Sequence, residues 1–124
     1  TFGQSVPAVS RADEVREGTI RSIVGVDENA AFRTNLVLAN ASEAQAEVEL
    51  QLFDAEGVAL GSKRVTLPPL GMTQLNRVVR EFVVTGEVSN ARLVLSTSEP
   101  FVGVTAYAAV IDNTTNDPRT ILPQ

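Results

Sequence analysis

The richest cluster of oxygen-bearing side chains lies near the C-terminal end of the chain. Asp112, Asn113, Asn116 and Asp117 offer carboxylate and amide oxygens, the ligand types that Ca²⁺ takes in sets of about six to eight. The run lacks the glycine and the distal glutamate of an EF-hand loop. Asn and Asp also form hairpin loops by bonding their own backbone. A turn is therefore the favoured interpretation, calcium binding is the weaker alternative, and no cofactor is expected.

Paired carboxylates are the only catalytic device that the composition leaves open. His and Cys are absent from the 124 residues, which excludes Cys/His zinc sites, disulfides and nucleophiles that depend on His or Cys. Glu47 and Glu49 form such a pair, but their spacing places them on a solvent-facing strand surface. Neither Asp-Thr-Gly nor Gly-x-Ser-x-Gly occurs in the sequence. We therefore expect that the protein is not an enzyme.

The charge distribution argues against nucleic acid and membrane insertion. The formal net charge is −5, from 15 acidic and 10 basic residues, and the bases are scattered, whereas phosphate backbones require clustered Lys and Arg. No apolar run approaches the ~20 residues of a membrane helix. The expected partners are proteins, either further copies of the chain or neighbouring modules.

Alternation of apolar and polar residues is the dominant signal for secondary structure. It is cleanest at residues 45–52, where one face is apolar and the other is polar, as in a strand with one buried face. A turn at 54–57 and a returning strand at 58–67 complete a hairpin. The apolar positions of the second strand change parity, which predicts a bulge near Gly61 and Ser62.

Further short strands follow the same pattern along the chain. They are expected at 19–26, 32–39, 72–75, 90–97 and 101–111, with a brief terminal strand at 121–122. Asn76 is a candidate cap for one short helix near 76–82. Seven or eight short strands without strand–helix alternation predict an all-β, antiparallel sandwich or barrel.

The strand at 101–111 lacks charge on both of its faces. One of these faces carries Tyr107, Ala109 and Ile111. In one interpretation this is a central strand whose second face lies under the short helix or a loop. In the other, the second face packs against another domain or subunit, and these three residues are interface candidates.

The N-terminal stretch is strand-capable but separate from the rest. Phe2, Gln4, Val6 and Ala8 alternate with a second set that includes Pro7, which restricts such a strand to a sheet edge. We expect residues 1–18 to be an extended segment or linker and 19–124 to be the β-sandwich domain. The segment can pair with its own domain's edge, the default, or with the edge of a neighbour by strand addition.

Four further segments carry a resemblance to a known group of proteins. They are 32–40, 52–61, 67–71 and 112–118, together with the opening 1–7. These resemble immunoglobulin-like β-sandwich modules of bacterial secreted and cell-surface proteins. The resemblance implies an immunoglobulin-like sandwich of about seven or eight strands, an extracellular or cell-surface location (or the periplasm), and a role as spacer, adhesive unit or building block. It implies no catalytic residues.

The expected function is therefore structural. We expect a repeat unit of a surface protein, or the subunit of a self-assembling fibre that uses strand pairing by the N-terminal segment. The alternative is a binding module, such as an adhesin or a protease inhibitor, that presents the loops at 27–31 or 112–118.

Overall fold

The computed structural model describes residues 14–124, which form eight strands and one short 3-10 helix. In chain order the elements are β1 (Arg21–Glu28), β2 (Phe32–Asn40), β3 (Ala46–Phe53), β4 (Ala59–Leu67), β5 (Met72–Leu75), η2 (Val78–Glu81), β6 (Val88–Ser96), β7 (Val104–Asp112) and β8 (Pro118–Ile121). Every predicted strand is present, and the helix falls inside the predicted range. The last strand begins at Pro118 rather than at residue 121, because it pairs with β7 from that residue onward.

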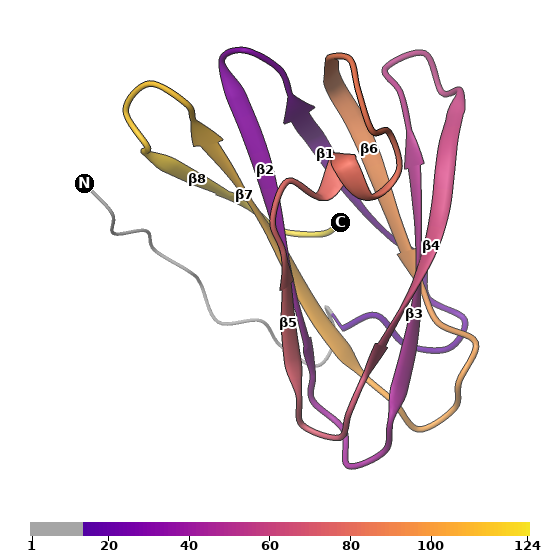
Figure 1. Ribbon diagram of the computed structural model, residues 1–124. Helices are drawn as coiled ribbons and strands as arrows, with labels where there is room; N and C mark the ends of the chain where they lie inside the picture. Colours follow the sequence, from indigo (N-terminus) through magenta and orange to yellow (C-terminus); the bar gives the residue numbers. More distant parts are fainter. Residues whose placement is uncertain (1–13) are drawn as a thin grey trace.

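The strands form two four-stranded antiparallel sheets that face each other across the core (Figure 1). Sheet A has the order β5-β2-β7-β8, and sheet B has the order β1-β6-β3-β4. The chain crosses between sheets at the β1–β2, β2–β3, β4–β5, β5–β6 and β6–β7 connections. The prediction of an all-β antiparallel sandwich is confirmed.

The hairpin of β3 and β4 follows directly from the alternating sequence. The apolar positions of β3, namely Ala46, Val48, Leu50 and Leu52, are all fully buried. The register shifts between the pair Leu52–Gly61 and the pair Phe53–Ala59, which makes Leu60 the extra residue of a bulge. The predicted bulge is therefore present, immediately before the expected position.

Two register shifts interrupt the pairing of β1 with β6: Gly25 is an extra residue of β1, and Asp27 stands opposite two residues of β6, Ser89 and Asn90. The backbone N–H of Asp27 instead donates to Thr34 Oγ1 (2.9 Å), and the Thr34 hydroxyl donates to the Asp27 carbonyl (2.8 Å). Thr34 is fully buried on β2. A single hydroxyl therefore ties the edge of sheet B to sheet A.

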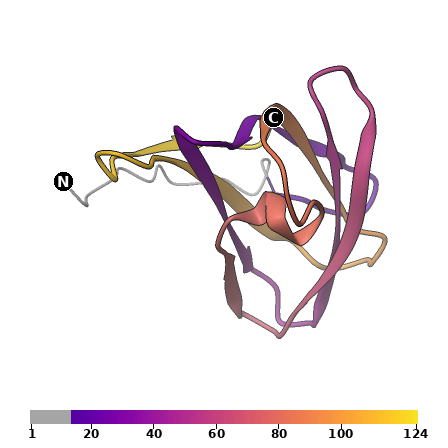
Figure 2. The ribbon, with the colours of Figure 1, turned by 45° about the horizontal axis from the view of Figure 1, so that its top comes forward.

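The hydrophobic core fills the space between the two sheets. Its largest members are one isoleucine of β1 and the leucines of β2, β3, β4 and β6. Figure 2 shows η2 between the sheets, where Val78 and Val79 are fully buried in the same core. The short helix thus closes the open side between the edge strands β4 and β5, and it does not cover the outer face of sheet A.

The start of η2 differs from the predicted cap. Arg77, not Asn76, occupies the N-cap position, with a φ of 52° and no side-chain cap bond. The Asn76 side chain instead accepts a hydrogen bond from Gln74 Nε2 (2.7 Å). Arg77 pairs with the buried Glu28 at the end of β1 (Nη1–Oε2 2.5 Å), so this turn is held by a tertiary ion pair rather than by a local cap.

The C-terminal residues close the opposite side of the sandwich. After β8 the chain leaves sheet A, and Gln124 exchanges two backbone hydrogen bonds with Ser22 of β1 (2.8 and 2.9 Å). Ile121 covers the bulge at Gly25, where an added Cβ would lie 3.7 Å from Ile121 Cδ1. The edge of β1 is therefore partly covered by the end of the chain.

Candidate interaction surfaces

The candidate calcium loop is organised around an arginine. Arg33 donates to Asn113 Oδ1 (2.8 Å) and to Asn116 Oδ1 (3.2 Å), so the amide oxygens that a cation would need face a guanidinium. Asp112 Oδ1 accepts from the backbone N–H groups of Thr114 and Thr115 (2.8 and 3.2 Å), as in an Asx turn. Asp117, the fourth candidate, belongs to the same loop. This arrangement builds a fixed hairpin loop, and residues 14–124 contain no group of three or more acidic side chains that could hold a metal.

The two loops that sequence analysis treated separately lie together at one end of the sandwich. Asn113 Nδ2 donates to the carbonyl of Asn29 (3.1 Å), and Asn29 Nδ2 donates to Ser89 Oγ (2.8 Å). Ala30 N–H donates to Glu87 Oε2 (2.8 Å). These bonds join the β1–β2, β5–β6 and β7–β8 connections into one ordered surface.

The paired carboxylates Glu47 and Glu49 lie on the outer face of sheet B. They line a shallow groove of about 180 Å³ together with Arg64 and the end of β6. Glu47 is 3.6 Å from Arg64, and both side chains of this pair are substantially exposed. The described residues that line the groove are all polar. They do not give the two carboxylates the different environments that an acid–base pair requires.

Residues just before β1 dock onto the start of β7. Val15 exchanges two backbone hydrogen bonds with Val104 (2.7 and 3.0 Å), and its side chain is fully buried in the core. Glu14 packs against Gly103, where an added Cβ would lie only 2.8 Å from Glu14 Oε1. Part of the segment predicted as a linker therefore contacts the sandwich, on the β8 side of β7.

The remaining edge of β7 on that side is short. The backbone groups of Val104 face Val15, and Ala108 and Val110 pair with Ile121 and Arg119 of β8. In an antiparallel ladder alternate residues face the same side, so only Ala106 lies between the Val15 bridge and β8. A strand that continued from Val15 toward the N-terminus has room for one further pair before it meets Ile121.

The interface candidates Tyr107, Ala109 and Ile111 lie on the outer face of sheet A. They alternate with buried β7 residues and stand opposite Val37, Asn35 and Arg33 of β2. Ala109 is buried, and Tyr107 and Ile111 are half-buried. No described helix covers this face, so the interpretation that the short helix covers it is wrong. The other candidates, Phe2, Gln4, Val6 and Ala8, lie outside the described residues.

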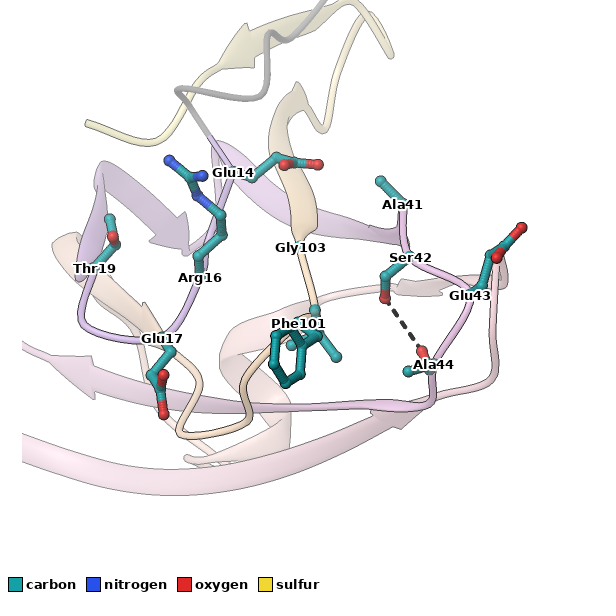
Figure 3. A pocket seen from close by; sticks show the side chains of 11 residues that line it. Glu14, Arg16, Glu17, Thr19, Ala41, Ser42, Glu43, Ala44, Phe101 and Gly103 are labelled. Atoms are coloured by element: carbon teal, nitrogen blue, oxygen red, sulfur yellow. Dashed lines mark hydrogen bonds between the residues drawn. The ribbon is translucent and has the colours of Figure 1, made fainter.

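A groove at the other end of the sandwich was missed by sequence analysis (Figure 3). It has a volume of about 860 Å³, and its charged side chains are Glu14, Glu17, Glu43 and Arg16. Phe101 stands in it with 95% of its surface exposed. Phe101 was predicted as the first residue of the strand at 101–111, but β7 begins at Val104 and leaves Phe101 in the preceding turn.

Two exposed apolar residues at this end have unusual backbone conformations. Phe101 has a φ of 65°, and Leu70, in the turn that contacts Ser42, has a φ of 55° and is 68% exposed. Each follows a proline, as in a type II turn, whose third position normally takes Gly or Asn. A left-handed conformation costs roughly 1–2 kcal/mol for a residue with a side chain. The signal in the sequence is a proline followed by a large apolar residue where a turn residue is expected.

Comparison with known proteins supports the fold and goes no further. No protein-family model and no curated sequence matches the chain. The chain is similar to the crystal structure of Thermotoga maritima 1070, with a TM-score of 0.61 and 11% sequence identity over 84% of this chain and 92% of that chain. Within residues 14–124 no helix is long and apolar enough to cross a membrane. At this identity the likeness establishes a shared two-sheet β architecture.

Proposed function

We propose that this protein is a non-catalytic structural module of an extracellular or cell-surface assembly, joined to neighbouring copies by strand pairing of residues 1–10. Such a module acts through its surfaces, which fits a chain without His or Cys. It also fits the groove beside Glu47 and Glu49, which is shallow and open to solvent. Repeat units of surface proteins and subunits of fibres are the two forms that this role takes.

The blocked edge of β7 is the observation that carries the proposal. Val15 enters antiparallel to β7, yet β8 occupies the same edge from Ala108 onward. Residues 1–10 therefore cannot extend along their own β7. Beside β8 they would run parallel to a strand of four residues that begins with Pro118, and parallel pairing is the less stable kind. A neighbour's free edge is the better acceptor.

The sheet order supports a relationship to immunoglobulin-like sandwiches. In those domains strand B lies beside E in one sheet, and C, F and G lie side by side in the other. The neighbours β1 and β6 match the first pair, and β2, β7 and β8 match the second set. The connection through β3, β4 and β5 differs from that scheme. The extracellular or cell-surface location follows from this relationship and is part of the proposal.

Deletion of residues 1–10 tests the proposed function. Sedimentation velocity over a range of concentrations should detect association of the full chain and its loss in the deletion variant. Thermal unfolding should remain almost unchanged, because Val15 and all eight strands stay in place. Equal association with and without the segment, or no association of either chain, would overturn the proposal.

A second candidate function, a loop-presenting binding module, is favoured by one observation. The loops at 27–31 and 112–118 are fixed to each other through Asn113 and to β2 through Arg33, and preorganised loops lose less entropy on binding. This candidate predicts capture of a protein partner that is lost when both loops are substituted. Capture that persists after both substitutions would exclude it.

A further inference from the structure

Four strands of the described sandwich lie at the edge of a sheet: β1, β4, β5 and β8. An edge strand exposes unpaired N–H and C=O groups that can accept a strand from another chain. Natural edges are blocked by bulges, inward-pointing charges, proline or covering segments. The four edges therefore differ in how well each can accept a strand.

The edge of β1 is interrupted and partly covered. It carries a bulge at Gly25, and Ser22 already pairs with Gln124. A continuous added strand would lose its register at Gly25, because a bulge inserts an unpaired residue into its own strand.

The edges of β4 and β8 are protected in other ways. β4 contains the bulge at Leu60, and its Lys63 is directed to Glu81 of η2 (Nζ–Oε1 2.9 Å). Arg64 adds a second charge to the same strand. β8 has only four residues, of which Pro118 has no N–H and Arg119 is charged.

Among residues 14–124, β5 shows none of these protections apart from its short length. Its residues Met72-Thr73-Gln74-Leu75 include no charge and no proline, and its four pairs with β2 are in unbroken register. Asn40 N–H donates to the carbonyl of Gly71 (2.8 Å), one step beyond the strand in the same register. Because alternate residues face the same side, Gly71, Thr73 and Leu75 face β2. The N–H and C=O groups of Met72 and Gln74 consequently face outward.

We propose that β5 is the acceptor edge of sheet A. Its occupant is residues 1–10 of a second copy of this chain, which add as a strand antiparallel to β5. This inference rests on the proposed function and names the surface that the proposed function uses. The sequence of the segment sets which of its residues bond. Pro7 has no N–H, so the alternate residues that include Pro7 must direct their backbone groups away from β5. Val6 and the residues in phase with it then exchange backbone hydrogen bonds with β5.

This phase places the apolar residues of the segment where the acceptor is also apolar. In an antiparallel pair, residues that exchange hydrogen bonds have their side chains on the same face. Met72 stands opposite Ala39 on the outer face of sheet A, and 68% of its surface is exposed. The set that contains Phe2 and Val6 would therefore lie beside Met72. It would extend the outer face that already carries Val37 and Tyr107.

Matched proline variants of the full chain test both halves of this pairing. Val6→Pro removes an N–H from the bonding set, whereas its control Ser5→Pro changes a residue in phase with Pro7. Gln74→Pro removes an outward N–H of β5, and its control Gln74→Thr keeps that N–H. Val6→Pro and Gln74→Pro should each raise the dissociation constant of the assembly, Kd, by about tenfold or more, because each removes roughly one ladder hydrogen bond and distorts the strand locally. Both controls should stay near the parent value.

The outcomes separate this inference from the proposed function. If association requires residues 1–10 but Gln74→Pro matches Gln74→Thr, another edge is the acceptor and the assignment to β5 is wrong while the proposed function stands. If association does not require residues 1–10, both fail. Met72→Asp provides a second variant in case Gln74→Pro does not fold. It keeps the backbone donor but adds a charge to the outer face, and association unchanged by it would also overturn the assignment to β5.

Discussion

The hydroxyl of Thr34 offers the sharpest test of how the two sheets are joined. It is the hydrogen-bond partner of both the N–H and the C=O of Asp27 (2.9 and 2.8 Å), a residue at the second register shift between β1 and β6. Thr34→Val replaces the hydroxyl by a methyl of similar size and leaves two backbone groups unpaired in a buried site. Thr34→Ser keeps the hydroxyl and removes only the buried methyl.

The two substitutions should lower the free energy of unfolding by different amounts, and the difference shows whether the hydroxyl or the methyl of Thr34 matters more. Each of the two buried backbone groups left without a partner costs about 1.5–2 kcal/mol, within the usual range for such groups, and the added methyl returns about 0.8 kcal/mol. Thr34→Val should therefore lower the free energy of unfolding by about 2–3 kcal/mol. Thr34→Ser should lower it by about 1 kcal/mol, the loss of one buried methyl group with a small cavity.

Urea and thermal unfolding followed by far-UV circular dichroism measure both changes. With about 3–5 °C per kcal/mol for a domain of this size, Thr34→Val should lower Tm by roughly 6–15 °C. Thr34→Ser should lower it by about half as much or less. If Thr34→Ser is the more damaging substitution, the site contributes through packing, and the hydroxyl does not tie β1 to β2 in the way described.

Three further predictions concern the core, the strained turns and the C-terminal loop. Leu50→Asp should abolish the cooperative unfolding transition, because an unpaired charge in the core costs several kcal/mol against a total stability of about 5–15 kcal/mol, while Glu49→Gln next to it should stay within about ±0.5 kcal/mol. Leu70→Gly and Phe101→Gly should each raise the free energy of unfolding by up to about 1 kcal/mol, because relief of the left-handed strain exceeds the added chain entropy; a loss would contradict the strain argument. Arg33→Ala should lower the free energy of unfolding by about 1 kcal/mol, because it removes the hydrogen bonds to the loop. Millimolar CaCl₂ should leave the Tm of the parent chain unchanged. A rise in Tm with calcium would contradict the turn interpretation.

The strand pattern was predictable because it depends on local alternation. Buried residues alternate with partly exposed ones along β3, and partly buried residues alternate with exposed ones along most of β4, so the period of two appears in the sequence itself. The parity change after Leu60 likewise gave the bulge a visible signal. The register shifts between β1 and β6 had no such signal, because Asp27 is accommodated by Thr34 from another strand. That contact depends on tertiary pairing.

The candidate surfaces depended still more on long-range contacts. The oxygens of Asn113 and Asn116 were visible in the sequence, but Arg33, which they bond, lies on a strand far away in the chain. The order of strands decided that β8 blocks the edge of β7 and that β5 is the least protected edge. No local pattern encodes either fact. Leu70 was missed because turn positions are expected to be polar or glycine, and Phe101 was missed because its apolar side chain fitted the start of the predicted strand at 101–111.

Intermolecular paramagnetic relaxation tests the central claim most directly. The chain has no cysteine, so Ala8→Cys gives a single attachment site for a nitroxide. The full chain with this nitroxide, at natural isotope abundance, is mixed with a ¹⁵N-labelled copy that lacks residues 1–10. The account predicts that amide signals of Met72 and Gln74 broaden most strongly in the labelled copy, with those of β1, β4 and β8 less affected. Strongest broadening at β1, β4 or β8, or none at any edge, would contradict it.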